Sequence, residues 1–214
     1  MQKAKPQKRF LPLVLPDIMR APSQLNTNLE VKGMRRVALS IAVVALVSAS
    51  TVVWAQGFKK ISEFLTGYQE VPAVSTTGNG EFSARISKDG TRIDWELSYS
   101  ELEGAVQQAH IHIGNKGVNG GISVFLCTNL GNGPAGTQPC PAPPANISGT
   151  IFAADVSPNI PATAAARTQG LNTGEIDELI KAIRAGATYV NVHSTTWPGG
   201  EIRSQIDGNS GHEH

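Results

Sequence analysis

Apolar and polar residues alternate along the chain from Ile61 onward, in short runs separated by turn residues. Successive side chains of a β-strand point to opposite faces, so each run predicts a strand with one buried and one polar face. The runs at 81–87 and 91–100 are joined by Lys88-Asp89-Gly90. Two alternating runs linked by Asp-Gly are typical of a β-hairpin. The residues expected to face inward are Phe82, Ala84, Ile86, Ile93, Trp95, Leu97 and Tyr99.

Five more short runs of this kind follow the hairpin. Many short strands with Gly- and Pro-rich turns between them favour a pair of packed sheets or one closed sheet. We therefore predict an all-β fold, an antiparallel Greek-key-like sandwich or barrel. The additional strands are expected at residues 109–114, 121–127, 146–156, 188–194 and 200–206.

The segment 172–187 departs from the alternating pattern. Its apolar residues recur at helical spacing, and Asn172 with Glu175 three positions later forms a capping-box pattern. Gly186 suits the end of such a helix. We predict one short amphipathic helix that packs across an open end or edge of the sheets with Ile176, Leu179, Ile180 and Ile183.

Residues 34–55 have the three parts of a secretory signal peptide. Arg35 and Arg36 provide a basic start, an apolar run follows, and Val53-Trp54-Ala55 is a cleavage-site pattern of the small-x-small type. The alternative is an uncleaved membrane anchor formed by Val37 to Ala55. Cleavage would place the mature chain outside the cytoplasm, secreted or periplasmic, and free of the membrane.

The signal peptide divides the chain into segments with different expected roles. The residues before it form either an unstructured extension or a start-site artefact, with Met34 as the true start. The expected segments are the extension 1–33, the signal peptide 34–55, a linker 56–63, one folded domain 64–207 and a flexible tail 208–214.

Charge and cysteine content narrow the function classes. The formal net charge is +1, and no basic stripe is interleaved with aromatic residues, so nucleic acid is not expected as a partner. Cys127 and Cys140 are the two cysteines of the chain, and in an exported protein this pair predicts a disulfide. Closing such a loop stabilises the fold by roughly 3 kcal/mol. A metal site built on these cysteines is the weaker alternative.

The histidines form the candidate chemistry. His110 and His112 share one face of a predicted strand, and His193 lies on the polar face of another. If these strands are neighbours, three imidazoles converge, and imidazole suits copper and zinc. The competing interpretation is a set of polar residues on the solvated face of a sheet. His212 and His214 fall in the expected tail.

Three stretches of the sequence are informative together: "FLTGYQEVPAVSTTGNGEFSARI", "AHIHIGNKGVNGGISVFL" and "LIKAIRAGATYVNVHSTTWPGGEIRSQI". They resemble the CHRD domain, which is named for its repeats in chordin. The resemblance runs from about Phe64 to Ile206 and implies an extracellular, β-rich domain. It implies no enzymatic activity. Ser204 stands where family members often have glycine.

A fainter likeness is to copper–zinc superoxide dismutase. It implies that His110, His112 and His193 are copper ligands and that Arg203 guides an anion. The sequence departs from that enzyme because no histidine lies between His112 and His193, so the bridging histidine and the zinc-binding loop are missing. Glu70, Glu201 and Arg203 are expected as charged neighbours of the histidine face. The alternative for Glu201, Arg203 and Gln205 is an ordinary polar strand face.

Together these observations predict a non-catalytic extracellular binding or structural module, without catalytic residues. Its expected partner is an extracellular protein or surface component that the sequence does not identify. The alternative is a copper-binding protein with a site at His110, His112 and His193 that carries out superoxide dismutase-like redox chemistry.

Overall fold

A computed structural model describes residues 60–208, which fall within one compact unit. The predictions for the extension 1–33, the signal peptide 34–55 and the histidines of the tail concern residues outside the described range. None of the helices within residues 60–208 has the length and apolar character needed to cross a bilayer. The first strand begins at Ile61, so it includes residues that the sequence assigned to the linker.

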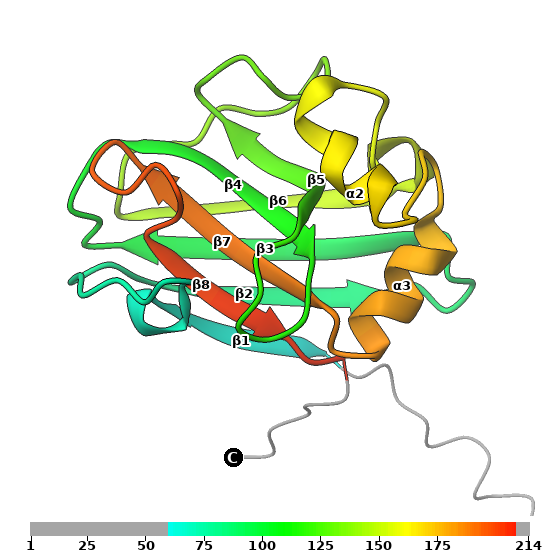
Figure 1. The fold of residues 1–214 in the computed structure, drawn as a ribbon, viewed down its shortest axis with the longest axis horizontal. Coiled ribbons are helices and arrows are strands. Elements are labelled where there is room, and N and C mark those ends of the chain that lie inside the picture. The colour runs from blue at the N-terminus through cyan, green and yellow to red at the C-terminus, as the bar shows by residue number, and fades with distance from the viewer. Residues whose placement is uncertain (1–59, 209–214) are drawn as a thin grey trace, which may run out of the picture. The chain divides into compact units, whose positions relative to one another are not determined.

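Within residues 60–208, eight strands form a single antiparallel sheet that curls into a nearly closed barrel (Figure 1). Their order across the sheet is β5-β4-β7-β8-β1-β2-β3-β6. The prediction of an all-β antiparallel fold is therefore confirmed. The strands are β1 (Ile61–Thr66), β2 (Asn79–Ile86), β3 (Arg92–Ser100), β4 (Val106–Ile113), β5 (Gly121–Thr128), β6 (Ala145–Phe152), β7 (Thr188–Ser194) and β8 (Ile202–Ile206).

The predicted hairpin is formed by β2 and β3, which pair from Asn79 with Ser100 to Ile86 with Ile93. Gly90 adopts a φ of 69° in the turn between them, a conformation that favours glycine. The alternation sorts the side chains as expected, because one face of each strand lines the barrel interior. The buried residues of this hairpin include Phe82, Ala84, Ile93, Trp95, Leu97 and Tyr99.

The barrel seam lies between β5 and β6, the two edge strands of the sheet. Gln138 spans the seam, since its side-chain Nε2 donates to the Leu126 carbonyl of β5 and to the Ser148 carbonyl of β6, both at 3.2 Å. The loop that carries Gln138 is closed by the Cys127–Cys140 disulfide, with a Cα–Cα distance of 5.1 Å. The predicted disulfide is confirmed, and its loop covers the otherwise unpaired edges.

The predicted amphipathic helix is α3 (Ile176–Arg184), which lies at one end of the strands (Figure 1). Its four predicted apolar residues are all buried. The expected cap at Asn172 is wrong, because α3 begins at Ile176 with Glu175 at its N-cap and no side-chain cap hydrogen bond. The Asn172 N–H instead donates to the Glu175 carboxylate at 2.7 Å. Gly186 follows the helix with a φ of 66°. A second helix, α2 (Ala164–Thr168), was not predicted, because a single turn leaves no helical periodicity in the sequence.

Three short 3₁₀ turns complete the described elements: η2 (Gly67–Gln69), η3 (Ala153–Asp155) and η4 (Pro161–Thr163). The loop between β4 and β5 crosses in front of β7 and β8 (Figure 1). That loop contacts His112 of β4 and Arg203 of β8 on the outer face of the sheet. The same face carries His193 of β7.

Candidate metal centre

Strands β4 and β7 are neighbours, so the condition for convergence of the three histidines is met. Across this pair, Gln108 lies opposite His193, His110 opposite Asn191 and His112 opposite Tyr189. Val190 and Val192 point into the barrel core, and the alternate residues of β7 therefore point to its outer face. The histidines come together on this outer face because of the register of one strand pair.

One nitrogen from each of the three imidazoles lies within 4.8 Å of the other two. The closest approach is 3.3 Å, between His110 Nδ1 and His193 Nε2. Two donors bound to one ion at about 2.1 Å are roughly 3.0–3.4 Å apart when they occupy adjacent coordination positions. The His110–His193 spacing is that of a hydrogen bond in the metal-free chain and also falls within the range for two ligands of a single ion.

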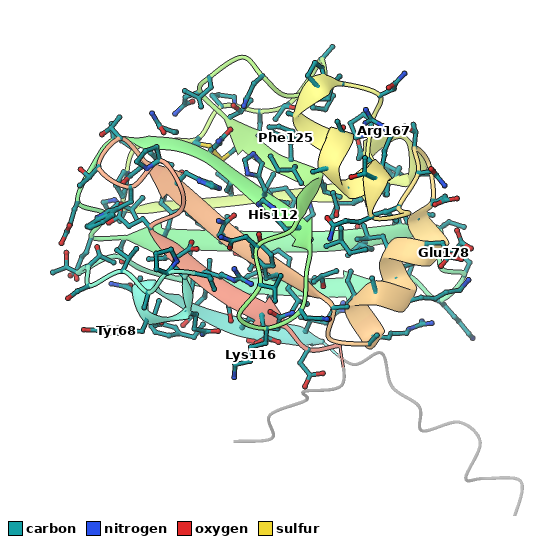
Figure 2. All side chains as sticks on the ribbon, viewed as in Figure 1. Tyr68, His112, Lys116, Phe125, Arg167 and Glu178 are labelled. Atoms are coloured by element: carbon teal, nitrogen blue, oxygen red, sulfur yellow. A yellow bond between two sulfur atoms is a disulfide. The ribbon has the colours of Figure 1, made fainter. Side chains whose placement is uncertain are left out.

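All three rings are buried, with exposed fractions of 0% for His110, 7% for His112 and 6% for His193. The interpretation of these residues as an ordinary solvated polar face is therefore wrong for the described fold. The loop from β4 to β5 and the turn after β7 cover the face that simple alternation would leave in water. Figure 2 shows His112 near the middle of this covered face, away from Lys116 and Glu178 at the periphery.

Burial keeps the three imidazoles neutral. It lowers the pKa of His110 well below its usual value, with the neighbouring His193 and His112 acting in the same direction. Burial lowers the pKa of His112 to about 4, against an opposing hydrogen bond to Gly120. The pKa of His193 is lowered by burial as well, against an opposing hydrogen bond to Pro198. Neutral imidazole is the form that binds metals.

In two of the imidazole rings, a hydrogen bond to a backbone carbonyl determines which ring nitrogen carries the proton. His112 Nδ1 lies 2.9 Å from the Gly120 carbonyl oxygen, and His193 Nδ1 lies 3.0 Å from that of Pro198. A carbonyl only accepts, so each Nδ1 donates. In a neutral ring the lone pair is then on Nε2. Metal-binding histidines in proteins use their second ring nitrogen in this way.

Two imidazole nitrogens have no hydrogen-bond partner. His110 Nε2 and His112 Nε2 are buried and make no hydrogen bond among the described residues. A buried polar atom without a partner costs about 1–3 kcal/mol, so such atoms are uncommon in folded proteins. The cluster therefore contains two buried imidazole nitrogens whose hydrogen-bonding capacity the described residues leave unused.

Asn191 and Glu70 lie next to the histidines. Asn191 Oδ1 is 3.1 Å from His193 Nε2, and its Nδ2 donates to Glu70 Oε1 at 3.3 Å. Burial raises the pKa of Glu70 to about 7, despite the hydrogen bond from Asn191 and the nearby Arg203. A side chain at Gly200, whose φ is 131°, would collide with the Glu70 carboxylate. Glycine at this position allows Glu70 to reach Asn191.

Tyr189 and Arg203 support the opposite side of the cluster. The Tyr189 ring stacks on His112 with centroids 4.6 Å apart, and the Arg203 guanidinium lies 3.4 Å from the Tyr189 centroid. Arg203 also donates to the Val118 carbonyl at 2.9 Å and to Asn119 Oδ1 at 3.0 Å. Arg203 therefore joins the covering loop to the ring that packs against His112.

The charged residues expected near the histidines lie in different places. Arg203 is on the same face but is only 1% exposed, beneath the covering loop. Glu201 is buried elsewhere, where its Oε1 accepts from Thr76 Oγ1 and from the Glu103 N–H, each at 2.7 Å. Glu201 thus connects two loops.

Sequence reasoning missed three contributors to the site. Alternation along β7 puts Asn191 on the same face as His193, but nothing in the sequence pattern gives it a role there. The Gly120 and Pro198 carbonyls leave no signal in the sequence, because any residue carries a carbonyl and only the folded loops direct it at a ring. The glycine-rich stretch after His112 was the available signal for Gly120.

Comparisons with known proteins give a family but no individual relative. The family model described as CHRD domain matches residues 61–206, more than half of the chain. Neither the curated proteins nor the solved structures contain a significant match. The matched range includes all eight strands and all three clustered histidines, so this chain belongs to the CHRD domain family.

Proposed function

We propose that this protein is an exported CHRD-domain protein that acts as a non-catalytic metal-binding module. Its site holds one transition-metal ion, with copper favoured, through His110, His112 and His193. The observation that carries the proposal is the pair of carbonyl contacts at Gly120 and Pro198, which leave the Nε2 lone pairs of His112 and His193 within a buried cluster.

The donor set favours copper or zinc over the alkaline-earth ions. Neutral imidazole nitrogens suit these transition metals, whereas calcium and magnesium prefer oxygen ligands. Between the two, a given nitrogen site usually binds Cu(II) more tightly than Zn(II). Copper is therefore the metal that we expect to bind most tightly.

Export is supported by the cysteine chemistry and by the family. The Cys127–Cys140 disulfide is of the kind that persists in oxidising compartments. The residues of the proposed signal peptide, 34–55, precede the family match. An extracellular protein or surface component as partner stays a prediction from the family resemblance.

The surroundings of the cluster support binding rather than turnover. Superoxide dismutase-like chemistry needs a guided path for an anion, and by analogy Arg203 would provide it. Here both terminal nitrogens of Arg203 donate to the covering loop, and the guanidinium packs on Tyr189. A guanidinium held in this way does not project to solvent.

The test is a Cu(II) titration of the purified full chain carrying His212→Ala and His214→Ala. These two substitutions remove the tail histidines from both of the chains that are compared. We expect one Cu(II) per chain, and loss of that binding in the further variant His110→Ala/His112→Ala. Equal binding by the two chains would overturn the metal-binding function. Superoxide consumption by the copper-loaded chain well above that of free copper would overturn the non-catalytic part.

A further inference from the structure

Glu70 orients the side-chain amide of Asn191 from the side away from the histidines. Its Nδ2 donates to Glu70 Oε1 at 3.3 Å, which turns Oδ1 toward His193 Nε2 at 3.1 Å. Asn191 is 2% exposed, so water does not compete for either contact. The absence of a side chain at Gly200 leaves the space that the Glu70 carboxylate and the Asn191 amide occupy.

The contact between Asn191 and His193 joins two acceptors. His193 donates its Nδ1 proton to the Pro198 carbonyl, so the neutral ring has a lone pair at Nε2. Asn191 Oδ1 is an acceptor as well. In the metal-free chain His193 Nε2 accepts from His110 Nδ1 at 3.3 Å, so Asn191 Oδ1 is the atom that faces a lone pair without a donor. Two such acceptors in a buried site repel, unless a positive group binds both of them.

The spacing fits a shared ion. Oδ1 lies 3.1 Å from His193 Nε2, and His110 Nδ1 lies 3.3 Å from that same nitrogen. Both values fall within the roughly 3.0–3.4 Å expected for adjacent ligands at about 2.1 Å from one ion. Asn191 also lies directly opposite His110 in the β4–β7 register.

We propose that Asn191 Oδ1 is the fourth ligand of the ion and closes a site of three imidazole nitrogens and one amide oxygen. This inference rests on the metal-binding function proposed above. Structural metal sites are fully occupied by protein ligands, whereas catalytic sites keep one position for water or substrate. In a closed tetrahedral arrangement, the fourth protein ligand occupies the position that a catalytic site keeps for water or substrate, which accords with the non-catalytic role proposed above.

Azide tests this arrangement because it binds Cu(II) only where a coordination position is free. The probe is Cu(II) on the full chain lacking the tail histidines, observed by electron paramagnetic resonance (EPR) and by absorption during an azide titration. We expect azide to leave the spectrum of this chain unchanged. In Asn191→Ala azide should shift the spectrum, and Cu(II) affinity should fall by at least the roughly 10-fold that loss of an outer-shell partner costs.

A second variant covers the case in which Asn191→Ala does not fold. In Glu70→Gln/Asn191→Asp, the carboxylate and the amide exchange places, so the hydrogen bond between them is kept while the oxygen offered to the ion becomes anionic. We expect changed EPR parameters with azide still excluded. A spectrum identical to that of the unsubstituted chain would overturn the assignment.

The outcomes separate the two proposals. If azide shifts the unsubstituted chain as it shifts Asn191→Ala, and the two have equal affinity, Asn191 is not a ligand and the three-histidine site stands. If the unsubstituted chain binds no Cu(II), the metal-binding function itself fails, and the inference about Asn191 fails with it.

Discussion

The Nδ1 atom of His110 lies 3.3 Å from the Nε2 atom of His193, although the two residues are 83 positions apart in the chain. The antiparallel register of β4 and β7 produces this contact, and the barrel interior takes the aliphatic residues of both strands. The histidines are thereby directed to one face, where loops exclude water. The predictions below follow from this buried cluster and its supports.

Cu(II) should stabilise the folded chain, because only the folded state brings the three imidazoles together. At a free concentration of 100 times the dissociation constant, one site adds about 2.7 kcal/mol to the free energy of unfolding. Thermal unfolding of the chain lacking the tail histidines, with and without Cu(II), measures this. The same chain carrying His193→Gln is the control and should gain no stability. An equal gain in the control would place the metal elsewhere.

Acidification should destabilise the metal-free protein between pH 6.5 and 4.5. The pKa values of the three clustered histidines are lowered in the folded state, to about 4 for His112. Below pH 6.5 these histidines therefore bind protons in the unfolded chain but not in the folded chain. Each histidine then lowers the free energy of unfolding by up to about 1.4 kcal/mol for each pH unit of acidification. Glu70 opposes this, because its raised pKa of about 7 gives the folded state an extra proton in the same window.

Three histidines against one carboxyl leave a net loss of stability on acidification. Urea unfolding of chelator-treated protein at several pH values measures it, and His112→Gln should show a shallower dependence than the unsubstituted chain. Stability that stays level or rises from pH 6.5 to 4.5 would contradict the buried, neutral state of the cluster.

Arg203→Met should destabilise the domain by about 2–4 kcal/mol, because it removes two buried hydrogen bonds and the contact with the Tyr189 ring. Arg85→Met is the matched control, since Arg85 is exposed on β2 and should change stability by less than about 0.5 kcal/mol. Chemical denaturation measures both. Equal effects would mean that Arg203 does not anchor the covering loop.

Replacing both cysteines, Cys127→Ala/Cys140→Ala, should lower the free energy of unfolding by about 3 kcal/mol. The disulfide closes the loop that carries Gln138 across the barrel seam. Denaturation of the unsubstituted chain under reducing conditions should show a loss of the same size. No loss in either experiment would mean that the seam is held without the disulfide.

The strands and the shared face of the histidines were predictable from the sequence. Period-two alternation places Phe82 and Ala84 inside with Ser83 outside, and the same rule puts His110 and His112 together. The disulfide followed from the presence of two cysteines in a chain expected to be exported. These features depend on local pattern, and the structure confirms them.

The burial of the site could not be read from the pattern. Alternation assigns a side chain to a face but does not tell whether another segment covers that face. The contacts that cover it join distant parts of the chain, such as Asn119 with Arg203 and Glu70 with Asn191, which are 84 and 121 positions apart. The choice between a solvated face and a buried cluster needed the tertiary structure.

The most direct test of the central claim is a crystal structure of the copper-loaded full chain, with an anomalous difference map calculated at the copper edge. The account predicts one strong peak within about 2.1 Å of a nitrogen from each of His110, His112 and His193. A map with no peak between these rings, or with its only peak elsewhere, would contradict it.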